Sequence, residues 1–344
     1  MSHGRFKNPV EATLTGIKDL FRRQPLADHL SERDRLDGKT CLVTGASSGL
    51  GFAVAVDLAR RGANLIMACR SGIPEAGERV KQLSGSSQVD MIHVDLTDLD
   101  SVHAFCEELK TRGVELDVLV SNAGVAPPRA RPTRHGLDEI FQVNYLAKFI
   151  LANRLLSEGI LPNATFAGNG RPAGRTPRII YISSDSHQGA SAIDYEEFGV
   201  YYDYGVRKSI NMYSYYKLVL NTFATELARR LQSEGQVDVS VNVMCPGPVN
   251  SNIARDAPPV LKGFMKLIFS VFFRSPEKAA RPVSYLTASS EMEGLTNDYL
   301  HMFNRKRMDE KVYLPEEGKK LWAASAAVWR RVDPRAGTYL LSDD

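Results

Sequence analysis

Short apolar runs alternate with amphipathic stretches along most of the chain. The runs are rich in Val, Leu and Ile and are typical of buried strands, whereas the stretches between them repeat apolar residues at the period of a helix. The expected strands are 40–44, 64–69, 116–121, 178–182 and 299–303, with a further strand that ends near Asp95; the expected helices are 74–84, 98–112, 136–158, 209–233 and 315–331. This alternation predicts a single α/β domain over residues 38–331, a Rossmann-type, doubly wound parallel sheet flanked by helices.

Three segments lie outside this alternation. Residues 1–37 form an N-terminal extension with apolar residues at helical spacing between Val10 and Phe21. We expect a helix there that packs on its own domain or on a second subunit, with a membrane surface or another partner as the alternative. Residues 257–273 are strongly apolar, and we expect a lid that lines or covers a hydrophobic pocket, or that dips into a membrane surface. Residues 332–344 form a short tail.

The composition and net charge exclude several classes of protein. The 344 residues are 43% hydrophobic, and a formal net charge of +3 spread along the chain gives no electrostatic footprint for nucleic acid. The four cysteines have neither metal-ligand spacing nor a disulfide framework, so we expect a reducing compartment and no bound metal. The start of the chain has no apolar signal-peptide core, and the longest apolar stretch, 263–273, is too short to span a bilayer. We therefore predict a cytoplasmic protein that is at most peripherally membrane-associated.

A glycine-rich turn joins the first expected strand to a helix. The sequence Gly45-Ala-Ser-Ser-Gly49-Leu-Gly51 follows the strand directly and opens a helix that Gly62 closes. In this context Gly45 permits the tight turn, Gly49 lets the backbone approach a pyrophosphate, and Gly51 lets the helix pack closely. Because a helix N-terminus attracts negative charge, the turn predicts a dinucleotide site. The expected cofactor contacts in this turn are Gly45, Ser47, Ser48, Gly49, Leu50 and Gly51.

The ends of the following strands refine this cofactor prediction. Arg70 follows the second strand, where an NAD site usually places an acidic residue, whereas an arginine suits the 2′-phosphate of NADP. We therefore expect NADP(H) to be preferred over NAD(H). Asp95 and Leu96 end the third strand, where a carboxylate can meet the adenine amine. The expected contacts after the fourth strand are Asn122, Ala123 and Gly124, at the sheet edge where ligands of such folds bind.

The main chemical signal is the pair Tyr213 and Lys217 on the expected helix 209–233. Four positions apart, the two residues stand on one helix face, where a lysine ammonium favours the phenolate and lowers the tyrosine pKa from about 10. A tyrosine that exchanges a proton near neutral pH requires such a neighbour. The alternative for an isolated pair of this kind is a surface helix with a stacked Tyr and Lys. The nearby Tyr215 and Tyr216 have no lysine four positions later.

Two further residues complete the expected catalytic set. Ser184 follows the strand 178–182, where its hydroxyl can donate a hydrogen bond to a substrate oxygen beside Tyr213. Asn144 lies in an apolar helical face, either as a satisfied core amide or as the holder of a water in a proton relay. His187 is a nearby acid/base candidate that the pattern does not require.

Together these residues resemble the short-chain dehydrogenase/reductase family over residues 38 to about 330. The matching motifs are Thr44-Gly-x-x-x-Gly-x-Gly51, Asp95, Asn122-Ala-Gly124, Asn144, Ser184, Tyr213-x-x-x-Lys217 and Cys245-Pro-Gly247. The resemblance implies that Tyr213 is the general acid/base, that Lys217 also binds the nicotinamide ribose, and that Ser184 orients the substrate oxygen. It also implies that Asn144 holds the water that links Lys217 to solvent.

The resemblance extends to the stretch that follows Cys245. It implies that Pro246, Gly247 and Val249 lie along the nicotinamide carboxamide. Ser251 stands where the family usually has a threonine, so a hydroxyl for cofactor contact is kept. The family also implies a homo-oligomer, a dimer or tetramer, that pairs through the two long helices.

Within the family, several stretches resemble the retinol dehydrogenase and protochlorophyllide reductase branch, among them 65–70 (LIMACR), 143–151 (VNYLAKFIL) and 181–187 (YISSDSH). The branch implies NADP(H) and a bulky hydrophobic substrate, retinoid-, steroid- or lipid-like, with a tyrosine-rich insert at 185–208 that shapes the substrate entrance. We expect the interconversion of an alcohol and a ketone or aldehyde. The alternatives are an NADPH-dependent reductase of a carbon–carbon double bond in a ring substrate and a non-catalytic NADP(H)-binding sensor or scaffold.

Overall fold

The computed structural model describes residues 26, 29–170, 176–233, 235–247 and 275–342. Most of the N-terminal extension and all of 257–273 lie outside the described residues, so the predictions for these two segments are not addressed by the structure.

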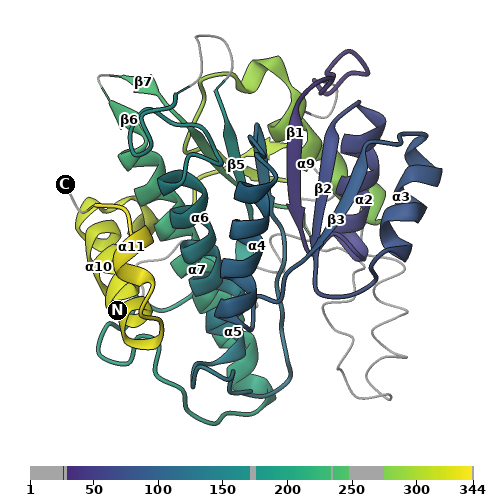
Figure 1. Ribbon diagram of the computed structural model, residues 1–344. Helices are drawn as coiled ribbons and strands as arrows, with labels where there is room; N and C mark the ends of the chain where they lie inside the picture. The colour runs from purple at the N-terminus through teal and green to yellow at the C-terminus, as the bar shows by residue number, and fades with distance from the viewer. Residues whose placement is uncertain (1–25, 27–28, 171–175, 234, 248–274, 343–344) are drawn as a thin grey trace.

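An eight-stranded sheet runs through the centre of the protein (Figure 1). Its strand order is β10-β9-β8-β5-β4-β1-β2-β3, and every pairing is parallel except that of β10 with β9. The first strand, β1, lies inside the sheet; β2 and β3 follow on one side of it, and β4, β5, β8 and β9 follow on the other. This is the predicted doubly wound arrangement. The strands are β1 (Thr40–Thr44), β2 (Asn64–Cys69), β3 (Val89–His93), β4 (Val118–Ser121), β5 (Arg178–Ile182), β8 (Ser240–Cys245), β9 (Tyr299–His301) and β10 (Asn304–Arg305).

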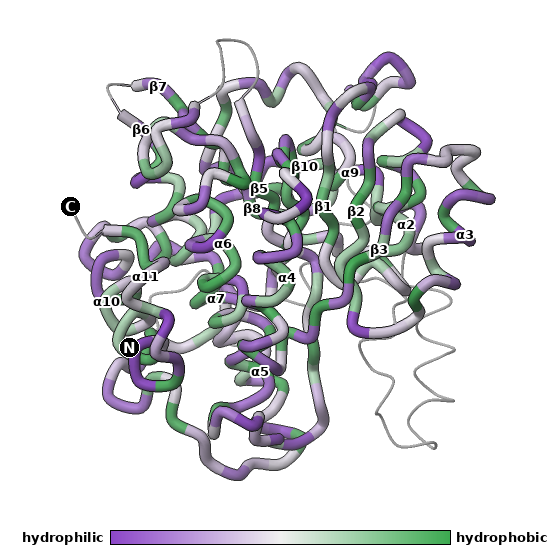
Figure 2. The backbone as a smooth tube through the Cα atoms, in the orientation of Figure 1, coloured by the Kyte–Doolittle hydropathy of each residue, from purple (hydrophilic) through white to green (hydrophobic). Residues whose placement is uncertain are grey.

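Helices cover both faces of the sheet and enclose two separate apolar cores (Figure 1). One face carries α2 (Gly49–Arg60), α3 (Glu75–Ser84) and α9 (Pro276–Ala288); the other carries α4 (Leu99–Thr111), α6 (Ala147–Ser157) and α7 (Val206–Arg230). Figure 2 shows the central strands as predominantly apolar, because parallel strands are buried on both faces of the sheet. The helices that cover the sheet carry many polar residues. Among the described residues, no helix combines the length and the apolar character needed to cross a membrane.

Shorter elements connect these layers. They are α5 (Glu139–Phe141), the π-helical stretch η1 (Gln142–Leu146), the 3₁₀ turns η2 (Asp185–Gly189), η4 (Ser290–Met292) and η5 (Glu310–Tyr313), and the hairpin β6 (Gln232–Ser233) and β7 (Gln236–Val237). The chain ends with the long helix α10 (Pro315–Val332) and the short α11 (Ala336–Tyr339).

The expected elements are present, but several of their boundaries differ from the sequence prediction. The predicted helix 136–158 begins only at α5, because the Asp138 carboxylate accepts the first free N–H groups of the helix, and it passes through η1 before it becomes α6. The predicted helix 209–233 starts earlier, at Val206, and ends at Arg230, since the next residues pair in the β6–β7 hairpin. The last predicted strand stops at β9 because Met302 takes a positive φ of 56°.

The helix α10 packs across α6 and α7 and seals the core on that side. Trp322 and Trp329 are buried, as the sequence predicts, and their rings lie 5.1 and 6.1 Å from the ring of Phe149 on α6. Phe223 on α7 joins the same cluster, 5.9 Å from Trp322 and 5.3 Å from Phe149. Such edge-to-face ring pairs add to the gain from burying apolar surface.

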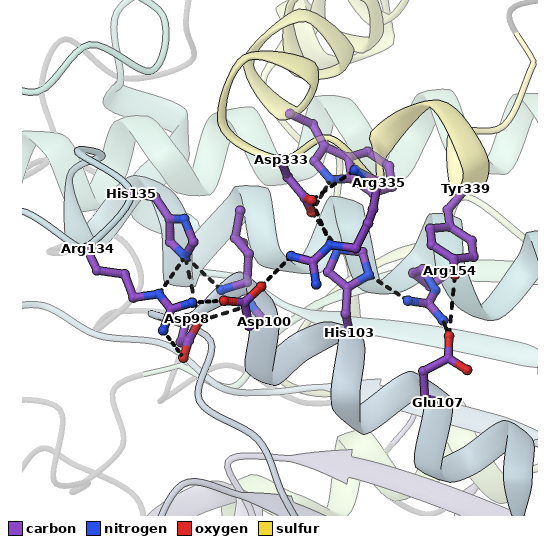
Figure 3. A network of polar contacts seen from close by, with 12 residues as sticks. Asp98, Asp100, His103, Glu107, Arg134, His135, Arg154, Asp333, Arg335 and Tyr339 are labelled. Carbon is purple, nitrogen blue, oxygen red and sulfur yellow. Dashed lines mark hydrogen bonds and ion pairs between the residues drawn. The ribbon is translucent and has the colours of Figure 1, made fainter.

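A polar network ties the chain that follows α10 to α4 and α6 (Figure 3). The imidazole of His103 on α4 bonds Asp333 through Nε2 at 2.6 Å and Arg154 on α6 through Nδ1 at 2.5 Å. Because an arginine only donates, Nδ1 must accept, and Nε2–H donates to the carboxylate. Burial lowers the pKa of His103, so the neutral ring that this pattern requires is favoured. Arg335 extends the network to Asp100 at 2.5 Å.

We expect the ring cluster beneath α10 to dominate the stability of this half of the core. Phe149→Ala should lower the free energy of unfolding by about 3–5 kcal/mol, because it removes a buried ring and leaves a cavity among three other rings. The measurement is the midpoint of denaturant unfolding. Leu83→Ala, at a side chain that is 53% exposed, is the control and should change the free energy by less than about 0.5 kcal/mol. Equal losses in the two variants would contradict this account of the core.

Candidate active site

A cavity of about 390 Å³ opens at the carboxyl ends of the parallel strands. It is bordered by residues that directly follow β1, β2, β3, β4, β5 and β8, which is where doubly wound sheets bind ligands. The predicted site residues that line it are Gly45, Ser47, Ser48, Gly49, Leu50, Gly51, Arg70, Asp95, Leu96, Asn122, Ala123, Gly124, Ser184, Tyr213, Lys217, Pro246 and Gly247. Asn144 does not line it, and Val249 and Ser251 lie outside the described residues.

The glycine turn forms a close backbone cradle at one end of this cavity. Gly45 has a positive φ of 65°, and a Cβ atom there would lie 2.9 Å from Cα of Ala123. A Cβ atom on Gly51 would lie 2.3 Å from the carbonyl oxygen of Gly45 and 2.4 Å from Nδ2 of Asn122. No side chain fits at either position, so the N-terminus of α2 reaches the sheet edge only with glycines here. The first-turn N–H groups of α2 thereby face the cavity, as an anion site requires.

Hydrogen bonds between β1 and β4 fix the width of this edge. The hydroxyl oxygen of Thr44 accepts the N–H groups of Asn122 at 3.0 Å and of Ala123 at 3.1 Å. In return, the Asn122 amide donates to the carbonyl oxygens of Thr44 at 2.9 Å and of Gly45 at 3.3 Å. These four bonds hold the residues after both strands in one arrangement.

Arg70 and Asp95 stand together at the cavity wall formed by the ends of β2 and β3. The Arg70 guanidinium is 3.9 Å from the Asp95 carboxylate. Oδ1 of Asp95 also accepts hydrogen bonds from the N–H and the hydroxyl of Thr97, at 2.9 and 2.7 Å, which orient the carboxylate. Arg70 remains 44% exposed along its side chain, so its donors are accessible from the cavity.

The side chain of Asn144 is occupied by backbone. Its Oδ1 accepts the N–H of Val125 at 2.8 Å, and its Nδ2 donates to the carbonyl oxygen of Val125 at 2.9 Å. Asn144 is fully buried within the π-helical stretch η1, and both of its polar atoms are thus used to hold the chain beside the cavity. Of the two roles considered from sequence, these contacts match a satisfied core amide, and the role in holding a relay water stays a prediction.

Lys217 and Tyr213 share one face of α7, as predicted, and both line the cavity. Nζ of Lys217 donates to the carbonyl oxygen of Ile182 at 2.9 Å and lies 5.4 Å from the centre of the Tyr213 ring. The electrostatics differ from the prediction, because burial raises the pKa of the Tyr213 phenol instead of lowering it. Burial also lowers the pKa of Lys217 to about 8, so its charged and neutral forms are both populated near that pH.

Ser184 lines the cavity, whereas His187 does not. Ser184 borders the cavity, and its Oγ accepts the N–H of Ser186 at 3.3 Å and the hydroxyl of Ser186 at 3.0 Å. His187 is fully buried outside the cavity: Nδ1–H donates to the carbonyl oxygen of Ser184 at 2.7 Å, and Nε2 accepts the N–H of Asp309 at 3.3 Å. Both ring nitrogens are therefore engaged in holding the loop, and His187 is no acid/base candidate.

Sequence reasoning missed several residues that line or support the cavity. Thr97 orients Asp95, Val125 is held by Asn144, and Arg131 lines the cavity from a loop of the chain. Only Thr97 carries a local signal, because a hydroxyl two positions after an aspartate commonly closes a turn. Within the described residues, no cluster of three or more His, Cys, Asp or Glu side chains is arranged to hold a metal ion.

The fold and the cavity together define a class: an enzyme with a Rossmann-type dinucleotide cradle and a tyrosine–lysine pair beside it. A model of the short chain dehydrogenase family matches residues 39–192. Retinol dehydrogenase 14 of Homo sapiens is 33% identical over 307 residues, which cover 84% of this chain and 86% of that protein. The polyprenol dehydrogenase of Homo sapiens is 29% identical over 291 residues, covering 83% and 84% of the two chains.

Solved structures agree with these relatives. The angucycline C-6 ketoreductase LanV, determined with bound NADP, superimposes with a TM-score of 0.57 at 26% identity and covers 77% of this chain and 94% of its own. The chain belongs to the short-chain dehydrogenase/reductase family, in its retinol dehydrogenase-like branch, and is an oxidoreductase that acts on CH–OH donors.

The burial of Lys217 leads to a stability test that needs no substrate. Its pKa is about 8 in the folded chain against an ordinary value of 10.5, so the unfolded chain binds more protons between these values and stability rises with pH there. From about pH 7.5 to about pH 9.5, the free energy of unfolding of the wild type should increase by about 1–2 kcal/mol more than that of Lys217→Met. Denaturant unfolding at the two pH values measures this difference. Lys319→Met, at an exposed lysine, controls for the loss of one charge, and identical slopes for all three proteins would refute the burial argument.

Proposed function

We propose that this enzyme interconverts an alcohol and a ketone or aldehyde on a bulky hydrophobic substrate with NADP(H), and that Tyr213 is its general acid/base. The observation that carries the proposal is the convergence of Ser184, Tyr213 and Lys217 on the cavity that the glycine turn also borders. Ser184 follows β5, Tyr213 and Lys217 lie on α7, and the turn follows β1, so the fold brings three segments far apart in the chain to one cavity.

Several residues of the cavity support the proposal of a dinucleotide with a 2′-phosphate. The cradle at Gly45 and Gly51 excludes side chains and faces the N-terminus of α2, which suits a pyrophosphate. All three line the cavity: Arg70 would bind the 2′-phosphate, Asp95 the adenine and Lys217 the nicotinamide ribose. NADP(H) supplies or accepts the hydride when it is bound.

The proton chemistry rests on the protein's own residues. Tyr213 gives its phenolic proton to the substrate oxygen during reduction and takes a proton from the hydroxyl during oxidation. Burial favours the neutral phenol, so Tyr213 begins as an acid in the reductive direction. Lys217, with a pKa of about 8, holds or releases a proton close to neutral pH, and Ser184 donates a hydrogen bond to the substrate oxygen.

The substrate class follows from the relatives and from the cavity wall. The named relatives act, by their names, on retinol and on polyprenol, both apolar alcohols. Beyond Asn122, the lining includes the apolar residues Val125, Ala126, Pro127 and Val143, next to the ion pair of Arg131 and Glu139. The apolar residues support a hydrophobic substrate. Analysis of the product, an alcohol or a saturated ring, separates carbonyl reduction from the alternative reduction of a carbon–carbon double bond.

We propose that any homo-oligomer of this chain forms through a surface other than the one where α10 crosses α6 and α7. The ring cluster of Phe149, Phe223 and Trp322 shows that this surface is already buried within one chain. Pairing through the two long helices along that surface would require α10 to leave, which would expose both buried tryptophans.

Replacing the proposed acid tests the chemistry. Tyr213→Phe removes only the phenolic proton, so kcat for NADPH-dependent reduction should fall about 100-fold or more while the Kd for NADPH changes less than about threefold. A panel of aldehydes, retinoids, steroids and quinones supplies the substrates, and NADPH consumption is the readout. Tyr201→Phe, at a half-buried tyrosine of the insert, is the matched control and should keep wild-type rates. Substantial activity of Tyr213→Phe with every substrate would exclude Tyr213 as the acid.

Reversing one charge tests the cofactor assignment. Arg70→Glu should lower the ratio of kcat/KM for NADPH over NADH by about tenfold or more, because the 2′-phosphate loses charge-assisted hydrogen bonds and meets a like charge. Steady-state kinetics with the two cofactors measure the ratio. Arg33→Glu makes the same charge change on an exposed residue away from the cavity and should leave the ratio unaltered. A ratio that does not move in Arg70→Glu would remove Arg70 from the cofactor site.

A further inference from the structure

A second cavity, of about 430 Å³, lies against a different face of α7 from the candidate active site. Lys208, Met212 and Tyr215 line it from α7 at intervals of three or four positions, so they share one helix face, while Tyr213 lies on another. The facing wall comes from the 185–208 insert. No residue of this insert lines the first cavity, whereas the insert forms much of the wall of the second; that the insert shapes the substrate entrance stays a prediction.

The floor of this second cavity is apolar and aromatic. Phe198 and Tyr216 are buried, at 6% and 4% exposure, and Tyr202, Met212 and Tyr215 are half-buried around them. The volume is in the range of small-molecule pockets. A hydrocarbon chain or a ring system that binds on such a floor buries its apolar surface away from water, which is favourable.

The hydroxyl of Tyr216 supplies a polar group without a partner. Although the residue is almost fully buried, its hydroxyl makes no hydrogen bond with any residue that the structure describes. Its neighbours differ: Tyr204 donates to Asp138 at 2.8 Å, and the Tyr215 hydroxyl oxygen accepts the N–H of Asp194 at 3.0 Å. This hydroxyl is not among the buried atoms that lack a partner, so it is accessible from the cavity and can bond a polar atom of a ligand.

The α7 end of the cavity is positively charged. Arg207 and Lys208 lie in the first turn of α7, and within the described part of the chain neither forms an ion pair with a carboxylate. Nζ of Lys208 stands 4.2 Å from the centre of the Tyr202 ring. The N-cap residue, Gly205, has no side chain to accept the first N–H groups of the helix, so the positive end of the helix dipole adds to the two cations.

The acidic residues of the cavity belong to the facing wall. Oδ1 of Asp194 accepts the N–H groups of Glu196 and Glu197, at 3.0 and 3.4 Å, so this carboxylate is held by its own turn. The side chain of Glu197 is in the same wall. The cavity is therefore polarised, with free donors on α7, which include the exposed amide of Asn211, and acids opposite. An anionic group is stabilised at the α7 end and a cationic one is not.

We propose that this cavity binds an anionic amphiphile, a molecule with a single carboxylate or phosphate and an apolar chain or ring system. The anionic head lies against Arg207 and Asn211, and the apolar body covers Phe198, Met212 and Tyr215. This site is separate from the cofactor and substrate cavity, and the proposal does not depend on which reaction the enzyme catalyses.

Isothermal titration of the full chain with dodecanoate, at saturating NADPH and below the micellar concentration, tests the proposal. Dodecanol and dodecylammonium have the same chain with a neutral or a cationic head. Dodecanoate should bind about tenfold or more tightly than either, because only its head forms charge-assisted hydrogen bonds. Equal affinity for the three, tighter binding of dodecylammonium, or no binding of dodecanoate would overturn the proposal.

Charge variants locate the bound molecule. Arg207→Ala should weaken dodecanoate about tenfold, and Arg207→Glu should reverse the preference in favour of dodecylammonium. Arg330→Ala, at an exposed arginine of α10, is the control and should bind like the wild type. Arg207 is itself exposed, so unchanged thermal midpoints are expected and verify that the variants fold. Unaltered dodecanoate affinity in Arg207→Glu would assign the binding to the active-site cavity and refute the second site.

Discussion

The contact between the ends of β1 and β4 is the constraint on which the active-site edge depends. Thr44 and Asn122 exchange hydrogen bonds across the two strands, and the Asn122 amide also reaches Gly45. Gly51 then brings α2 so close to both that a single added carbon would overlap them. The width of the cavity, the direction of the α2 N-terminus and the pairing of the central strands are thus set by the same few atoms. A change at any of them alters the cradle and the sheet together.

Burial governs the chemistry of the tyrosine–lysine pair. A lysine one helical turn from a tyrosine is expected to favour the phenolate, yet Lys217 gives its hydrogen bond to Ile182, and desolvation raises the pKa of Tyr213. The same burial weakens the hold of Lys217 on its proton. A neutral acid beside an amine that titrates near neutral pH is a state suited to proton transfer in either direction. The pKa values of Tyr213 and Lys217 therefore depend on the burial of each side chain as well as on their spacing along the helix.

Two faces of α7 line two different cavities. One face carries Tyr213 and Lys217 at the candidate active site, and another lines the aromatic cavity together with the insert. Along its C-terminal half, α7 is covered by α10 through Phe223 and Trp322. This helix is consequently fixed by the core at one end, while its first turns face solvent, with Val206 and Ile210 exposed at 56% and 59%. A molecule that binds beside those turns contacts the least covered part of the helix that carries Tyr213 and Lys217.

The sequence by itself determined the fold class, the glycine cradle and the residues that meet at the sheet edge. These features follow from local rules: a strand, a glycine turn and a helix are adjacent in the chain, and parallel strands bring their carboxyl ends to one edge whatever lies between them. Only the tertiary structure decided how Asn144 is used, which way the pKa of Tyr213 moves, and that the 185–208 insert encloses a second cavity. Each of these depends on burial and on contacts between segments far apart in the chain, for which neighbouring residues carry no signal.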